Sequence, residues 1–252
     1  MAYTIAVAGK GGTGKTTLCG LLISALCREG KGPVLAVDAD SNSNLNEVMG
    51  VAVEKTLGSV REEIKGGDGI PASSSRGDYL DAQFDRALIE DDDFDMLVMG
   101  RTQGTGCYCF VNSLLKTRIA RFSGNYKYVV ADNEAGMEHL SRGVLPGADM
   151  ILIVSDCSRR GIQAAARIRD LVGELDMRPS AVRLIINRAP DGAPDAGVLA
   201  EAAAHGLDVA GVVPHDRLVY EFDCEGRPTA QLPEESPARQ AFERIMRGAL
   251  AL

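Results

Sequence analysis

The residues best suited to chemistry stand near the start of the chain, in Gly9-Lys10-Gly11-Gly12-Thr13-Gly14-Lys15-Thr16-Thr17. This run satisfies every fixed position of the pattern G-x-x-x-x-G-K-[ST] and follows an apolar stretch. Glycines here allow successive backbone N–H groups to surround phosphate oxygens, Lys15 to reach the β- and γ-phosphates and the Thr16 hydroxyl to bind Mg²⁺. A plain glycine-rich turn before a helix would leave Lys15 unexplained. We therefore predict a nucleotide site formed by Gly11, Gly12, Thr13, Gly14, Lys15, Thr16 and Thr17.

Acidic residues end two further apolar runs. Asp38 and Asp40 close one of them, and Asp132 closes another, four residues before Gly136. The carboxyl ends of strands in an open α/β sheet face the ligand crevice, so these carboxylates are expected to point towards the phosphates. The alternative for Asp38 and Asp40 is that they cap a following helix.

The elements that must position these groups alternate along the chain. The pattern predicts a mostly parallel sheet of about seven or eight strands with helices on both faces, in one α/β domain over residues 1–252. The predicted strands are Thr4–Ala8, Val34–Asp38, Met96–Gly100, Tyr128–Asp132, Met150–Ser155, Leu184–Asn187 and Val209–Pro214. The predicted helices include Thr16–Arg28, Phe110–Phe122, Gly161–Leu175, Val198–His205 and Pro237–Leu250.

A second lysine, Lys10, gives the loop the form Lys-Gly-Gly-x-Gly-Lys-Thr, which resembles the deviant Walker A subgroup of P-loop ATPases. That subgroup includes the MinD/ParA proteins, the nitrogenase iron protein and the CooC-type nickel-insertion ATPases. The resemblance implies ATP hydrolysis to ADP, a homodimer, and a Lys10 that reaches the partner's nucleotide. It also implies that Asp38 and Asp132 hold Mg²⁺ through water, that Asp40 orients the attacking water, and that the Gly136 N–H senses the γ-phosphate.

Two later strand ends are candidates for base recognition. By the same resemblance the Asn187 side chain, followed by Arg188, reads the adenine edge, and backbone groups at Pro214 and His215 complete the pocket. No Asn-Lys-x-Asp sequence follows Asn187, so ATP is favoured over GTP.

Cys107 and Cys109 form a Cys-x-Cys pair between a predicted strand and helix. In an extended segment such residues project from one face, about 6.6 Å apart. Two thiols at this spacing can pack together, or their thiolates can converge on one metal. A symmetric dimer would supply four thiolates, which suits tetrahedral Zn²⁺ or square-planar Ni²⁺.

The thiol pair, with the run from Asp132 to Arg142, most resembles CooC-type ATPases, which assist nickel insertion into carbon monoxide dehydrogenase. The main hypothesis is an ATP-dependent metallochaperone whose partners are a second copy and an apo nickel enzyme. An electron-donating ATPase like the nitrogenase iron protein is an alternative, which the lack of a cysteine between Cys109 and Cys157 disfavours. A positioning ATPase of the MinD/ParA type is the other.

Composition bears on the remaining classes of function. The formal net charge of −8 argues against broad affinity for nucleic acid or anionic membranes, and no apolar run approaches membrane-spanning length. We expect a cytoplasmic protein that binds neither nucleic acid nor membrane. Its six cysteines are then expected to be mostly reduced thiols.

Overall fold

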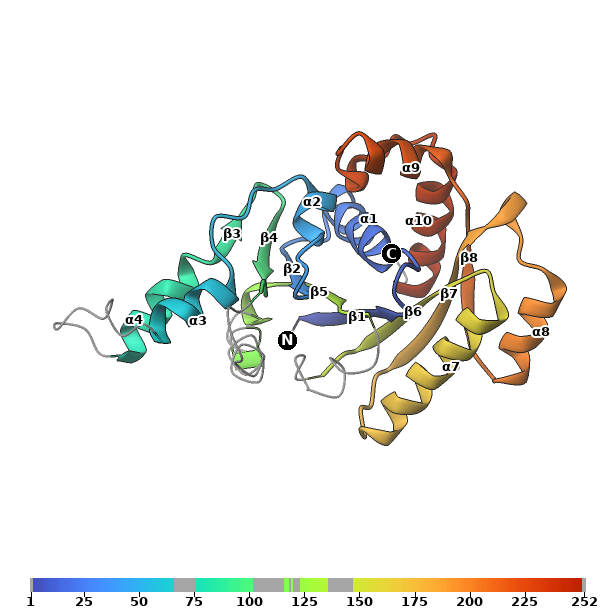
Figure 1. Ribbon diagram of the computed structural model, residues 1–252, viewed down its shortest axis with the longest axis horizontal. Helices are drawn as coiled ribbons and strands as arrows, with labels where there is room; N and C mark the ends of the chain where they lie inside the picture. Colours follow the sequence, from blue (N-terminus) through green and yellow to red (C-terminus); the bar gives the residue numbers. More distant parts are fainter. Residues whose placement is uncertain are drawn as a thin grey trace.

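The computed structural model describes residues 2–65, 76–101, 116–117, 119, 123–135 and 147–250. Its centre is an eight-stranded sheet in the order β3-β4-β2-β5-β1-β6-β7-β8 (Figure 1). Neighbouring strands run parallel except at the edge, where β3 pairs antiparallel with β4. The predicted fold class is therefore confirmed. The strands are β1 (Tyr3–Gly9), β2 (Val34–Ala39), β3 (Leu88–Glu90), β4 (Phe94–Val98), β5 (Tyr128–Asn133), β6 (Met150–Asp156), β7 (Ala181–Ala189) and β8 (Val209–Pro214).

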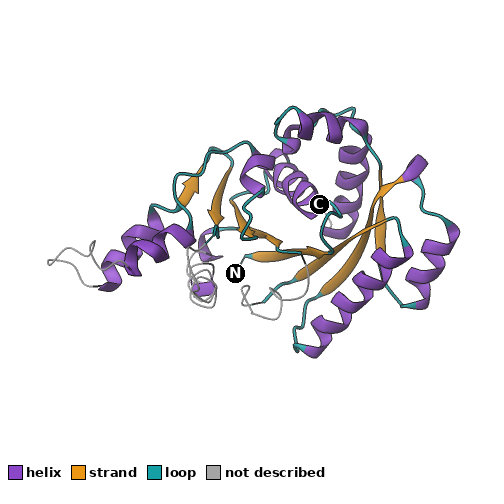
Figure 2. Ribbon diagram, in the orientation of Figure 1, coloured by secondary structure: helices purple, strands orange, loops and turns teal. Residues whose placement is uncertain are grey.

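Helices cover both faces of the sheet (Figure 2). One face carries α1 (Lys15–Arg28), α2 (Leu45–Met49), α9 (Arg217–Cys224) and α10 (Pro237–Leu250). The opposite face carries α3 (Leu57–Lys65), α4 (Arg76–Asp85), α7 (Arg159–Glu174) and α8 (Ala196–Ala204). Among the described residues, no helix combines the length and apolar character that a membrane crossing needs.

The central strands are buried on both faces, as expected for a parallel sheet between two helical layers. In β1, Ile5 and Val7 join the core under α1 and α10, whereas Ala6 and Ala8 join the core under α7. The helix predicted at Pro237–Leu250 is present as α10 and packs on the core, because Phe242 and Met246 are each only 1% exposed. This double core fixes the strand ends that carry the candidate site.

Some predicted elements differ from the structure. The strand predicted at Met96–Gly100 lies two residues earlier, as β4. β3 was not predicted, because a run of three residues, two half-buried and one exposed, is too short to produce a strand pattern. Most of the helix predicted at Phe110–Phe122 lies outside the described residues.

Candidate functional site

The loop between β1 and α1 folds tightly on its own backbone. Thr13 is fully buried, and its hydroxyl donates to the Lys10 carbonyl at 2.9 Å. Lys15 begins α1 and is only 7% exposed, with its ammonium nitrogen 3.4 Å from the same carbonyl. Burial lowers the pKa of Lys15, while the charges of Asp132 and Asp40 act in the opposite direction. The structure therefore places the Lys15 ammonium inside the loop, near the predicted acids.

The end of β7 braces this loop. The Asn187 amide nitrogen donates to the Thr13 carbonyl at 2.8 Å, and an Arg188 guanidinium nitrogen donates to the Gly12 carbonyl at 2.9 Å. Gly14 has a φ of 89°, and a Cβ there would lie 2.4 Å from the Asn187 amide nitrogen. Only glycine fits this close, left-handed position.

The Asn187 side chain thus has a structural task that the sequence did not reveal. Its amide oxygen also accepts from the Arg188 N–H at 2.9 Å, so both ends of the amide are bonded within the protein. Its predicted contact with the adenine edge stays a prediction.

Two predicted magnesium residues lie side by side on neighbouring strands. β2 and β5 pair in a register that sets Asp38 beside Asp132. Burial raises the pKa of Asp38 to about 6, although its two carboxylate oxygens accept N–H bonds from Asp40 and Leu45, each at 3.0 Å. Burial also raises the pKa of Asp132 to about 7, with nearby acidic charge adding to the effect. Two carboxylates held together out of water favour a bound cation.

The residues present fit a magnesium ion. Asp132 is 2% exposed, and its Oδ1 atom has no hydrogen-bond partner in the described part of the chain. The Thr16 side chain hydrogen-bonds with the same carboxyl group. Carboxylate and hydroxyl oxygens, partly through water, are the ligands that Mg²⁺ prefers. Thr16, Asp38 and Asp132 would hold the ion, which would neutralise phosphate charge.

Asp40 lies in the loop after β2. A hydrogen bond connects this loop to the segment that follows β4. The Asp40 Oδ1 atom accepts the Asn42 N–H at 2.8 Å, and the Asn42 side-chain oxygen accepts from the Arg101 guanidinium at 2.6 Å. Ser43 in this loop has a φ of 54° and a buried hydroxyl oxygen that lacks a partner among the described residues. We refer to residues 40–44 as the switch loop.

Three predicted site residues cannot be placed. Cys107, Cys109 and Gly136 lie outside the described residues. Within the ranges that the structure describes, no three His, Cys, Asp or Glu side chains are grouped to hold a metal ion. The nickel or zinc site therefore stays a prediction.

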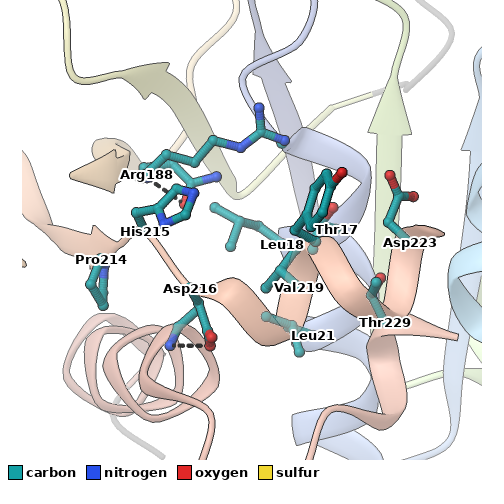
Figure 3. Close-up of a pocket in the computed structure, with 14 residues that line it drawn as sticks. Thr17, Leu18, Leu21, Arg188, Pro214, His215, Asp216, Val219, Asp223 and Thr229 are labelled. Atoms are coloured by element: carbon teal, nitrogen blue, oxygen red, sulfur yellow. Dashed lines mark hydrogen bonds between the residues drawn. The ribbon is translucent and has the colours of Figure 1, made fainter. Parts of the chain in front are cut away.

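Two cavities adjoin the loop. The larger, about 930 Å³, includes Lys15, Thr16 and residues of α2 among its walls. The smaller, about 420 Å³, has an apolar floor of Leu18, Leu21 and Val219 (Figure 3). All four predicted base-recognition residues line the smaller cavity: Asn187, Arg188, Pro214 and His215.

Sequence reasoning missed the wall that α9 contributes to the smaller cavity. Val219, Tyr220 and Asp223 line it from this helix. Asp216 begins α9 by accepting the Leu218 N–H at 2.9 Å. An aspartate two residues after Pro214 is a helix N-cap pattern that could have revealed the element.

A glycine-rich loop between a strand and a helix, a buried lysine and two paired carboxylates define a P-loop nucleotide-binding protein. Comparison with known proteins agrees: the chain belongs to the family described as the CobQ/CobB/MinD/ParA nucleotide binding domain, which matches residues 4–229.

Two relatives and one solved structure illustrate the range of similarity. The chain is 40% identical over 246 residues to an ATP-binding protein of Methanocaldococcus jannaschii named as uncharacterized, with 96% of each chain covered. It is 30% identical over 234 residues to the carbon monoxide dehydrogenase accessory protein CooC of Rhodospirillum rubrum, covering 88% of this chain and 87% of the relative. The septum site-determining protein MinD of Pyrococcus horikoshii, solved with Mg-ADP, shares the fold with a TM-score of 0.73 at 23% identity, covering 100% and 98% of the two chains.

Proposed function

We propose that this protein is an ATP-driven metallochaperone that hydrolyses ATP and delivers Ni²⁺ to an apo enzyme such as carbon monoxide dehydrogenase. The observation that carries the proposal is the Cys107-Tyr108-Cys109 sequence in a chain 30% identical to a carbon monoxide dehydrogenase accessory protein. The ATPase part rests on the family and the site geometry, and the metal part rests on the thiol pair.

In the hydrolytic part, each side chain has a distinct task. Lys15 neutralises charge between the β- and γ-phosphates, and Thr16, Asp38 and Asp132 hold Mg²⁺. Asp40 orients the attacking water, for which a carboxylate is suited because it accepts a water proton. The Gly136 N–H senses the γ-phosphate.

In the metal part, two subunits share one ion. Each chain contributes the thiolates of Cys107 and Cys109, and four soft anionic ligands suit Ni²⁺ or Zn²⁺. ATP closes the dimer around this site, and hydrolysis reopens it for delivery. In the described part of the chain, β4, which precedes the thiol segment in the sequence, lies beside β2, which carries Asp38.

The alternative of a positioning ATPase has its own support, since the solved MinD structure shares the fold. The thiol pair and the net charge of −8 favour metal handling over action on DNA or anionic membranes.

The test is a calorimetric titration of the reduced, metal-free protein with Ni²⁺ and with Zn²⁺. Each titration is done with and without ATP. Binding is expected to saturate near half an equivalent per chain and to be lost in the C107S/C109S double variant, because a serine hydroxyl is a hard and neutral ligand. The C157S/C224S double variant is the matched control, which also removes two thiols but leaves the pair intact.

Either of two results would remove the shared site: one metal per chain, or unchanged affinity in C107S/C109S. An absorbance spectrum of anaerobically purified protein distinguishes the metallochaperone from the electron-donating ATPase. Because an iron–sulfur cluster absorbs visible light, a visible absorbance band would favour the electron-donating ATPase. Both double variants must still bind ADP for the comparison to hold.

A further inference from the structure

The two cavities beside the P-loop share part of their lining, and we call this shared part the boundary. Five residues line both of them: Gly14, Thr17, Arg188, Asp223 and Thr229. A nucleotide with its base in the smaller cavity and its phosphates near Lys15 must place its sugar at this boundary. The boundary is therefore where a protein side chain could distinguish one nucleoside sugar from another.

Thr229 at this boundary carries an unsatisfied hydroxyl. The residue begins a short 3₁₀ turn, Thr229–Gln231, and is only 4% exposed. Its Oγ1 atom has no hydrogen-bond partner among the described residues. Buried hydroxyls are nearly always bonded in native proteins, so an orphan that lines a ligand cavity points to a bond with the ligand.

Asp223 is the second feature of the boundary. It lies one residue before the end of α9, and Figure 3 shows its side chain at the same end of the cavity as Thr229. Asp223 is exposed, and no hydrogen bond or ion pair to its carboxylate occurs within the described ranges. Its oxygens are free to accept from a ligand.

Asp216, which lines the same small cavity, provides a contrast. One of its carboxylate oxygens accepts the Leu218 N–H, and the other accepts the Ser236 hydroxyl at 2.5 Å and the Ala238 N–H at 3.1 Å. Asp216 is thus committed to holding α9 against the start of α10. Of these two cavity acids, Asp223 is the one with its carboxylate available.

We propose that Asp223 and Thr229 form a ribose subsite that makes this protein select ribonucleotides. The Asp223 carboxylate accepts hydrogen bonds from the sugar hydroxyls, and the Thr229 hydroxyl bonds with the same sugar. A vicinal diol supplies two O–H donors, and bonds to a carboxylate are stronger than those between neutral groups. The inference rests on the proposed function only in requiring that ADP or ATP occupies the site.

The experiment compares the affinities of the full-length protein for ADP and for its 2′,3′-dideoxy analogue by calorimetry. Wild type is expected to bind ADP on the order of tenfold more tightly, the size expected from losing a charge-assisted hydrogen bond. Asp223→Ala should reduce this ratio to near one. Thr229→Val should reduce it less, and Thr229→Ser, which keeps the hydroxyl, should retain it.

Glu221→Gln is the matched control, because it removes the same charge from the same helix while Glu221 pairs with Arg217 instead. Its ratio should match wild type. Equal affinities of wild type for the two nucleotides, or a ratio unchanged in both Asp223→Ala and Thr229→Val, would overturn the subsite. The wild-type ratio needs no variant, so poor folding of a mutant cannot hide that result. Failure of wild type to bind ADP at all would overturn the subsite together with the ATPase function, so the two failures are distinguishable.

Discussion

Lys15 is the residue on which the proposed hydrolysis of ATP depends most directly. It lies buried in the loop, and the acidic charges of Asp132 and Asp40 act on it. Lys15→Ala is expected to lower the steady-state rate of phosphate release at least about 100-fold, because no ammonium then neutralises charge between the β- and γ-phosphates. Lys127→Ala, which removes an exposed lysine at the opposite end of the sheet, serves as the control. Near-normal turnover of the Lys15 variant would contradict the assignment.

Asp40 and Asp38 differ in their surroundings, which leads to a second prediction. Asp38 is fully buried, whereas Asp40 is partly exposed in the switch loop. Asp40→Asn should bind Mg·ATP but hydrolyse it slowly, because an amide oxygen holds the water without a charge-assisted bond. The variant should accumulate as an ATP-bound dimer on size exclusion. Hydrolysis at the wild-type rate would move the water-orienting role to another group.

Local spacing accounts for what could be predicted at this scale. The glycine-rich loop was predictable because its function is fixed by neighbours in sequence. The hydrogen bond from Asn187 to Thr13 joins residues that are 174 positions apart in the sequence. The unbonded hydroxyl of Thr229 lines a cavity that several elements build together. No local pattern could reveal them.

At the scale of elements, α1 and α10 are joined by an ionic network centred on Glu243. Its carboxylate accepts from Arg239 at 2.8 Å and also from Arg28, and its side chain is 17% exposed. Burial alone would raise the pKa of Glu243, but the hydrogen bonds and charges of the two arginines outweigh it and lower the pKa below its ordinary value of 4.5. The ionised carboxylate therefore stabilises the helix pair.

Glu243→Gln is expected to lower the free energy of unfolding by about 1–2 kcal/mol at pH 7, measured by urea denaturation. A lowered pKa in the folded state gives stability that is present above pH 4.5 and is lost as pH falls through the folded-state pKa. The difference between variant and wild type should accordingly shrink towards pH 3. Glu234→Gln, at an 88% exposed position near Arg239, should change little at either pH. A difference that does not depend on pH would show that packing, not charge, is lost.

Long apolar runs made most of the sheet predictable, whereas short elements were not. The five residues of α2 and the three of β3 are held by their neighbours rather than by their own periodicity. α9 was not predicted, because it follows directly on Pro214 and His215, whose expected role is in the base pocket.

At the scale of the whole molecule, Lys10 tests whether the active unit is a dimer. Its side chain is exposed, although its carbonyl is enclosed by Thr13 and Lys15. Lys10→Ala should leave ADP binding by a single subunit intact but impair hydrolysis and ATP-induced dimerisation, measured by light scattering. Loss of ADP binding from the isolated subunit would mean that Lys10 acts on its own nucleotide.

Mixing the Lys10→Ala and Lys15→Ala proteins sharpens this prediction. A mixed dimer contains one site with its own Lys15 and the partner's Lys10, so the mixture should partly recover hydrolysis that neither variant has alone. A mixture as inactive as its components would argue against exchange of lysines between subunits.

The hydrogen bond between Arg101 and Asn42 raises the question of how the two parts of the proposed function would affect each other. It joins the switch loop, which carries Asp40, to Arg101, a residue that precedes the thiol segment in the sequence. Linkage between two sites is reciprocal: if ATP changes the affinity for Ni²⁺ by some factor, Ni²⁺ must change the affinity for ATP by the same factor. Bound Ni²⁺ would then be an effector of the ATP site, and the protein with Ni²⁺ bound would have a different affinity for ATP from the metal-free protein.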